Sequence, residues 1–370
     1  MSSETKEQDL RSRSPQSEVP NRPDRPLAVD PSGTPRAERS AKKAHSDESV
    51  PDLKEQKKFL PNNPEEKLDI NEIPVSTKTF IVMTNVNLNL LELFRTLNVV
   101  EYVPFPKTRG KKKENTKKNL DLPDGSIITL EIGNLFRGVL LKKKKKKKSE
   151  TGEELDLQTK PFRNSLTVVM VIDGKKINFK VYRNGKFQLT GCKTDKHAME
   201  CIKHMWKYVG KTDIFQYQNK KTFEAIFVPA MRNIDFKLGF MVNRENLDKY
   251  INTETNYTSL LETSIGYTGV NIKIPVRSSI LDLKIKKLRW SNRHESWRKI
   301  VKVPYQEFLD KLTPKERKKK LEKRVLVTFL VFNSGSTIVS AMCKEVMKDV
   351  FYEFCRIIQQ NRVLFEEKIG

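Results

Sequence analysis

Short runs of alternating apolar and polar residues, separated by turn residues, fill the chain from Thr77 onward. The clearest group consists of three such runs, at residues 165–172, 176–182 and 186–190. They are joined at Asp173-Gly174 and Asn184-Gly185, dipeptides that tolerate the positive φ of a tight hairpin. The pattern predicts a meander of antiparallel strands.

An amphipathic helix pattern follows this meander. Over residues 195–209 one apolar stripe recurs at helical spacing, formed by Ala198, Ile202, Met205, Trp206 and Val209. A second stripe closes the chain over residues 344–365, formed by Val346, Val350, Phe354, Ile357 and Ile358. We expect each helix to cover one face of the strands before it.

The unit of strands and helix occurs twice. VYRNGKFQLTGCK at residues 181–193 and VFNSGSTIVSAMCK at residues 331–344 each contain an aromatic residue, a glycine turn, a short run and a Thr or Ser. Further strand patterns lie at residues 79–84, 125–141, 223–238, 267–276, 324–332 and 337–340, and short helix patterns at 88–97 and 244–251. Each half thus runs strand, helix, several antiparallel strands and helix, which predicts an α+β fold with a tandem repeat.

Three regions follow from the composition along the chain. Residues 1–72 are polar and almost free of aromatic residues, which is typical of a disordered tail. The first repeat is expected over residues 73–210, with charged insertions at about 107–121 and 142–160. The second repeat is expected over residues 222–370, with a basic insertion at about 278–323.

The alternation along the strands separates two faces of the sheet. In the strand 177–182 the inward residues are Ile177, Phe179 and Val181, and the outward ones are Asn178, Lys180 and Tyr182. The strand 324–332 is instead apolar on both faces, so we expect either a partner or a helix from the insertion to cover its second face.

Charge narrows the choice of partner. The chain has 71 Lys and Arg against 46 Asp and Glu, a formal net charge of +25. This excess favours a polyanion such as nucleic acid. The sequence shows no long apolar run and no secretory signal, and its four scattered cysteines are typical of reduced thiols, so we expect an intracellular protein without a membrane span.

Catalytic and metal-binding patterns are weak. No phosphate-binding loop, nucleophile elbow or paired-carboxylate motif occurs, so we expect neither an enzyme nor a cofactor or small-molecule substrate. His197, Cys201 and His204 have helical spacing suited to zinc, but no fourth ligand is evident and we expect no metal.

The doubled unit resembles the TATA-binding protein family. That family repeats an aromatic residue, a Ser-Gly-Lys turn and a Val-Thr-Gly-Ala-Lys strand before a long helix. Residues 182–193 (YRNGKFQLTGCK) are similar to this motif, as is the turn at residues 332–335, whereas residues 340–343 have diverged. With its insertions and tail, the chain is most similar to the TATA-binding-protein-like transcription factors of large DNA viruses.

The resemblance implies a saddle-shaped, curved antiparallel sheet with pseudo-two-fold symmetry and helices on the convex face. The concave face would bind the minor groove of A·T-rich promoter DNA, insert aromatic side chains between base steps and bend the duplex. The implied wedge residues are Tyr182, Phe162, Phe332 and Tyr267.

The resemblance also implies residues that contact the groove and the phosphates. The expected groove contacts are Asn233, Thr190, Ser340, Gln188, Ile338, Thr79 (or Thr77) and Ile81. Asp235 would face the same groove, and its carboxylate weakens the expectation of a strict TATA preference. The expected phosphate contacts are Lys186, Lys193 and Lys273, supplemented by the insertion lysines Lys284, Lys286, Lys287, Lys318, Lys319 and Lys320.

The function that the resemblance implies is transcription initiation. A transcription-factor-IIB-like protein and RNA polymerase subunits would be the partners, in the host nucleus, in a cytoplasmic viral factory or in the virion. Three alternatives stay open: a non-specific nucleic-acid-packaging protein, a protein-docking module, and, more distantly, a glycosylase-like module.

Overall fold

The structure is a computed structural model and describes residues 58–63, 65–102, 121–139, 147–148, 154–155, 164–261 and 269–367. All of these belong to one compact unit, Leu53–Gly370. The predicted wedge residues Phe162 and Tyr267 lie outside the described residues, as do most of the insertions expected at about 107–121 and 142–160.

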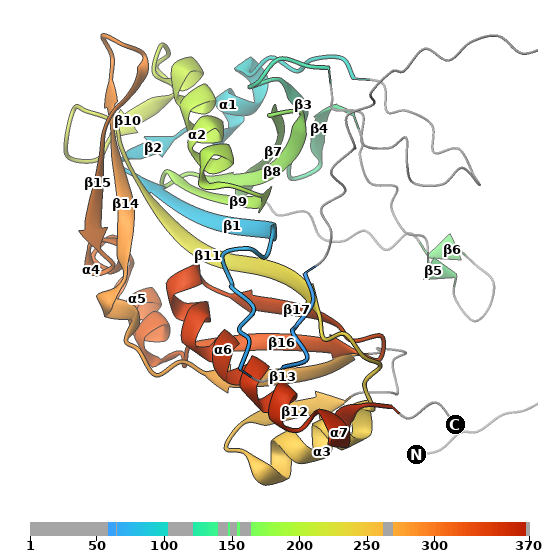
Figure 1. Cartoon of the computed structure of the whole chain (residues 1–370). Helices are drawn as coiled ribbons and strands as arrows, with labels where there is room; N and C mark the ends of the chain where they lie inside the picture. The colour runs from blue at the N-terminus through green and yellow to red at the C-terminus, as the bar shows by residue number, and fades with distance from the viewer. Residues whose placement is uncertain are drawn as a thin grey trace, which may run out of the picture. The chain divides into compact units, whose positions relative to one another are not determined.

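One antiparallel sheet of 13 strands forms the body of this unit (Figure 1). The first half supplies β1 (Val75–Thr84), α1 (Leu90–Thr96), β3 (Ile127–Ile132), β7 (Ser165–Ile172), β8 (Lys175–Tyr182), β9 (Lys186–Cys192) and α2 (Asp195–Val209). The second half supplies β11 (Glu224–Lys237), α3 (Arg244–Glu254), β12 (Thr258–Leu261), β13 (Gly269–Pro275), β16 (Leu326–Phe332), β17 (Ser336–Ala341) and α6 (Lys344–Gln360).

The strand order shows the repeat directly. It runs β12-β13-β16-β17-β11-β1-β9-β8-β7-β3-β4, so the two halves meet at β1 and β11 and fan outward in the same sequence. Smaller elements complete the chain: β2 (Val86–Leu88), β4 (Leu135–Gly138), β5 (Lys147–Lys148), β6 (Glu154–Leu155), β10 (Phe215–Tyr217), β14 (Lys284–Ser291), β15 (Ser296–Pro304), α4 (Gln306–Leu309), α5 (Pro314–Glu322), α7 (Arg362–Phe365) and the 3-10 turn Ile280–Asp282.

The register of the strands obeys a pseudo-two-fold axis. Phe80 opposes Leu189 in the first half, as Ile234 opposes Val339 in the second. Lys78 and Arg232 occupy equivalent positions and pair with each other, so the axis passes between them. Even the irregularities correspond, because β1 bulges at Ser76 and β11 bulges at the equivalent Ala230.

Two equivalent asparagines begin the short helices of the halves. The Asn89 side chain accepts a hydrogen bond from the backbone N–H of Glu92 at the start of α1. The Asn243 side chain accepts one from Asn246 in the same way at the start of α3. Both are N-caps, which satisfy a backbone donor that the helix itself leaves unpaired.

Each half has its own hydrophobic core beneath its long helix. Phe179 and Leu189 pack under α2 with Ile202, and all three are fully buried. In the second half Phe329 stacks on Phe354 of α6, with ring centroids 4.0 Å apart. Both helices therefore cover the same face of the sheet, which we call the helix face; the opposite one is the open face. The predicted α+β repeat, with a curved antiparallel sheet and helices on one face, is confirmed (Figure 1).

Part of the region expected to be a disordered tail is folded. Within residues 1–72, residues 58–63 and 65–72 pack on the second half and bury three apolar side chains, Leu60, Leu68 and Ile70. Gln359 of α6 holds this segment by donating hydrogen bonds to backbone carbonyls of Pro61, Asn63 and Glu66. The expectation of a tail as far as residue 72 is thus wrong for these residues, because tertiary contacts with α6 replace the missing local pattern.

The basic insertion of the second half is folded. Its β14 pairs with β11 and then with β15, which extends the sheet beside the central strands. Its α4 lies under the open face, where Tyr305, Phe308 and Leu309 pack on Met83, Ile226 and Val228 of β1 and β11. The insertion helix thus covers β1 and β11, whereas the expected cover of the strand 324–332 is not found, because no residue of β16 belongs to this cluster.

Candidate nucleic-acid interface

The open face at the centre of the sheet presents hydroxyl and amide groups. Thr77 and Thr79 of β1 alternate with residues that face the helices, and Thr77 lies opposite Asn233 of β11. Of the two threonines considered from the sequence, Thr79 occupies the position equivalent to Asn233 about the pseudo-two-fold axis. The buried Oδ1 of Asn233 has no hydrogen-bond partner among the described residues, so it retains an acceptor that a ligand could satisfy.

Tyr182 and Phe332 are equivalent residues at the ends of β8 and β16. Both are half-buried on the open face, and neither belongs to the cores beneath the helices. The Tyr182 hydroxyl lies 3.5 Å from Gln188 Oε1, and the Nζ of Lys186 lies 5.5 Å from its ring centroid. Phe332 lies over Gly269, where an added Cβ would come within 3.4 Å of its ring.

Two further pairs lie between these aromatic residues and the centre. Gln188 and Ile338 are equivalent, as are Thr190 and Ser340, and all four are half-buried on the open face. The Thr190 hydroxyl donates to the Asn178 carbonyl oxygen at 3.0 Å, so it already has a partner across the strands. These predicted groove residues therefore share one face.

Two predicted residues depart from this arrangement. Ile81, expected in the groove, packs against the cluster that α4 forms with the central strands and is only partly exposed. Its equivalent, Asp235, does lie on the open face, 3.5 Å from the Ser76 hydroxyl. The open face is consequently unequal in its two halves, with a covered isoleucine in one and a carboxylate in the other.

The outer part of the first half is also covered. Val169 and Val171 of β7 are buried on the open face beneath Tyr102 and Leu122. Tyr102 is held there by Lys176, whose Nζ lies 2.9 Å from its hydroxyl. In contrast, Leu260 of β12 is 56% exposed in the second half, so more of the open face is accessible there.

The predicted phosphate contacts lie at the surface. Lys193 and Lys273 are exposed, and Lys186 is half-buried beside Tyr182. Two of the insertion lysines form ion pairs. Lys286 pairs with Asp195 on the helix face, and Lys287 pairs with Glu307 and, at 3.6 Å, with Glu224. These two are therefore engaged within the fold.

Helix α5 carries Lys318, Lys319 and Lys320 close to the open face, whereas Lys284 lies at the start of β14. A capping box at Thr313 and Glu316 starts this helix, and the hydrogen bonds from Thr313, assisted by the charge of Lys186, lower the pKa of the Glu316 carboxyl. Burial lowers the pKa of the Lys320 ammonium, with further effects from Lys323 and Lys186. The basic helix thus lies beside Lys186, with Lys315, Lys318 and Lys319 exposed.

The open face also contains residues for which the sequence analysis predicts no DNA contact. Lys180 and Leu330 are equivalent residues on β8 and β16, and strand alternation alone places them beside Tyr182 and Phe332. Asn271 of β13 also lies on this face, and its buried Oδ1 lacks a partner among the described residues. No local pattern identifies Asn271, because its position follows from the register with β16.

The candidate zinc ligands on α2 serve the fold. His197 is buried, accepts a hydrogen bond from the Lys193 N–H at Nδ1, 3.2 Å away, and has its Nε2 3.4 Å from Asp173. Burial raises the pKa of the Cys201 thiol well above its usual value, which disfavours the thiolate that binds metal. Within the part of the chain that the structure describes, no three His, Cys, Asp or Glu side chains are grouped to hold a metal ion.

Among the helices of the described residues, none is both long and apolar enough to cross a bilayer.

Comparisons with known proteins give distant similarities. No family profile matches the chain. It is 24% identical over 228 residues to the uncharacterized protein 335L of Invertebrate iridescent virus 6, covering 60% of this chain and 67% of that protein. It is also similar to the solved structure of the Methanococcus jannaschii TBP, with 13% identity, a TM-score of 0.36, and coverage of 78% of this chain and 98% of that one. Neither similarity is high enough to assign the chain to a family.

Proposed function

We propose that this protein binds double-stranded DNA through the open face of its sheet. The proposal rests chiefly on the pseudo-two-fold register, because it brings equivalent pairs of aromatic and small polar side chains to one face without a long helix over it. These pairs are Tyr182 with Phe332, Thr79 with Asn233, and Thr190 with Ser340. The net charge of +25 supports a polyanionic ligand.

The minor groove is the proposed docking site on DNA. Its base edges carry mainly acceptors at A·T pairs, and it is read by small polar and apolar side chains rather than by a helix. Tyr182 and Phe332 would enter base steps from the two halves, and the unstacking energy would be offset by wider contact with a bent duplex. The Tyr182 hydroxyl would retain Gln188 or water as a partner.

The basic helix α5 would bind phosphates beside the first half. Its exposed lysines neighbour Lys186, and the equivalent residue of the second half is the uncharged Ser336. The insertion would thus add to the positive charge of the first half, and it would not replace the charge missing at Ser336. Phosphate contacts of this kind contribute affinity and salt dependence but little sequence information.

At the level of the cell, we propose a role in transcription initiation. A protein that bends promoter DNA would recruit a transcription-factor-IIB-like protein and RNA polymerase subunits, in a nucleus or a viral factory. The resemblance of residues 182–193 to the TATA-binding protein motif supports this role.

The direct test is duplex binding by the double variant Tyr182→Ala and Phe332→Ala. Because each base–aromatic stacking contact is worth about 1–3 kcal/mol, the variant should bind an A·T-rich duplex at least about tenfold more weakly. The control is Leu91→Ala, which removes an exposed apolar side chain from α1. Equal affinity of the two variants, measured by fluorescence anisotropy, would exclude the open face as the DNA-binding surface.

A non-specific packaging protein is the second candidate. The partial cover of the first half by α4 and Tyr102 favours it, since a shortened open face offers fewer base contacts. It predicts a steep dependence of affinity on salt and equal affinity for A·T-rich and G·C-rich duplexes. A preference for A·T-rich duplexes that persists across a salt titration would reject it.

A further inference from the structure

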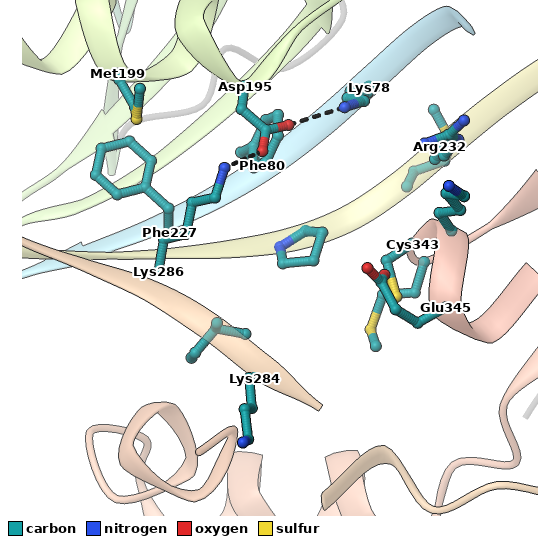
Figure 2. Close-up of a pocket in the computed structure, with 15 residues that line it drawn as sticks. Lys78, Phe80, Asp195, Met199, Phe227, Arg232, Lys284, Lys286, Cys343 and Glu345 are labelled. Carbon is teal, nitrogen blue, oxygen red and sulfur yellow. Dashed lines mark hydrogen bonds and ion pairs between the residues drawn. The ribbon is translucent and has the colours of Figure 1, made fainter. Parts of the chain in front are cut away.

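We propose that a pocket on the helix face binds an acidic segment of a partner protein. One bulky apolar side chain of that segment would enter the pocket, and the carboxylates on either side of it in the segment would meet the cations at the pocket's edge. The pocket lies between the N-terminal ends of α2 and α6, and β1, β11 and β14 complete its wall (Figure 2). Lys78 and Arg232 line it, so it lies on the pseudo-two-fold axis, on the side of the sheet away from the proposed DNA surface.

The interior of the pocket is apolar. Phe80, Phe227 and Pro229 line it from the central strands, and Met199 and Met342 line it from the regions of the two long helices. Methionine side chains are flexible and polarizable and adapt to bound aromatic or aliphatic groups. An apolar side chain of a ligand would therefore find complementary surface here.

Cations surround this apolar interior. Five basic side chains line the pocket against two acidic ones; the basic residues are Lys78, Arg232, Lys284, Lys286 and Lys344, and the acidic residues are Asp195 and Glu345. Asp195 binds Lys78 at 2.8 Å and Lys286 at 2.6 Å (Figure 2). Although burial opposes it, hydrogen bonds from these two lysines lower the pKa of the Asp195 carboxyl, so it stays ionised and already paired.

Positive charge remains after this pairing. Within the described residues, Arg232 and Lys284 form no ion pair, and the buried Nε of Arg232 has no hydrogen-bond partner. Burial lowers the pKa of the Arg232 guanidinium, and the charges of Glu345 and Asp195 oppose this effect only in part. The N-terminus of α6 adds to this field, and Glu345 in its first turn offsets part of it.

The size of the pocket selects the kind of ligand. Its volume is about 240 Å³, whereas small-molecule sites usually enclose about 300–1,000 Å³. One large side chain of a protein fits this space better than a complete cofactor. The cations at its edge then select carboxylates on either side of that side chain, which identifies an acidic segment with an apolar anchor as the occupant.

The test uses the full chain and a fluorescein-labelled peptide with one phenylalanine between runs of Asp and Glu. Two further peptides replace the phenylalanine by alanine, or the acidic residues by Asn and Gln. The protein variant is Arg232→Gln with Lys284→Gln, which removes the two unpaired cations. Its control is Arg298→Gln with Lys299→Gln, which removes the same charge from exposed positions of β15.

The first peptide should bind the unaltered protein, and the pocket variant should weaken it by about tenfold or more while the control variant has little effect. Loss of either the phenylalanine or the carboxylates should weaken binding comparably. Equal binding by the two protein variants, or by the peptides with and without phenylalanine, would overturn the proposal. Displacement of the peptide by duplex DNA would also overturn it, by showing a general polyanion surface. The result does not depend on whether the open face binds DNA.

Discussion

Gly185 and Gly335 allow the two hairpins of the repeat to close. Both have positive φ, 69° and 70° respectively. A Cβ on Gly185 would lie 2.1 Å from the Val86 carbonyl oxygen, and a Cβ on Gly335 would lie 2.2 Å from that of Phe240. Since Val86 and Phe240 hold equivalent places after β1 and β11, the same steric constraint preserves glycine in both copies.

The first prediction concerns these glycines. Gly335→Ala should lower the free energy of unfolding by about 2–4 kcal/mol, because backbone strain and a clash with a carbonyl add together. Gly133→Ala is the control, since Gly133 also has positive φ, 56°, but an added Cβ there meets no atom within 4 Å. Chemical denaturation should show a loss of only about 1 kcal/mol for the control. Similar losses for the two variants would contradict the role assigned to the Phe240 carbonyl.

The second prediction concerns His197. Burial lowers the pKa of its imidazole, with a smaller opposing effect from Asp173. The folded state therefore binds fewer protons than the unfolded state below about pH 6.5, so stability should fall as the pH decreases from about 7 to 5. His197→Asn should reduce this slope, measured by denaturation at several pH values. An unchanged slope would show that His197 titrates alike in both states.

At the scale of elements, the insertion determines how the open face can be used. Phe308 of α4 is 1% exposed and packs with Tyr305, their ring centroids being 5.3 Å apart. This small cluster lies against β1 and β11 and attaches α4 and the following α5 to the sheet. The position of the basic helix thus depends on a few apolar contacts.

The third prediction tests this attachment. Phe308→Ala should remove about 3–5 kcal/mol of packing energy. Hydrogen exchange should accelerate in α4, α5 and β15 while the amides of α2 remain protected. Leu321→Ala, at an exposed position of α5, should leave exchange unchanged. Uniform acceleration across the chain would show that the insertion does not unfold separately.

The fourth prediction concerns the Tyr305 hydroxyl, which is buried without a hydrogen-bond partner among the described residues. Burial raises the pKa of this side chain to about 12. Tyr305→Phe removes an unsatisfied polar group and keeps the ring, so it should leave the free energy of unfolding unchanged or raise it by up to about 1 kcal/mol. A clear loss of stability on denaturation would mean that the hydroxyl has a partner.

The elements differ in how well local sequence predicts them. The meander and the helix Asp195–Val209 follow from residue spacing and turn glycines, which act over a few residues. Residues 58–63 and 65–72 do not, because their buried side chains Leu60, Leu68 and Ile70 follow no period and are placed by contacts with the second core and by backbone pairing with Lys237 of β11. The cover of Ile81 by α4 also escapes prediction, since it depends on how a distant insertion packs on the sheet.

At the scale of the molecule, the pseudo-two-fold sheet has two faces with different chemistry. The helix face contains a cationic pocket on the axis, whereas the open face presents paired aromatic, hydroxyl and amide groups. The insertion breaks the symmetry on both faces, since β14 lines the pocket and α4 covers Ile81. We therefore expect DNA to contact the two halves unequally, with the larger base contact in the second half.

Bending of a duplex labelled at both ends, measured by fluorescence energy transfer, tests the central claim most directly. The full chain should increase transfer on an A·T-rich duplex and less on a G·C-rich one, and Phe332→Ala should reduce the effect more than Tyr182→Ala does. Saturated binding with no change in transfer on either duplex would contradict insertion of these aromatic side chains into DNA.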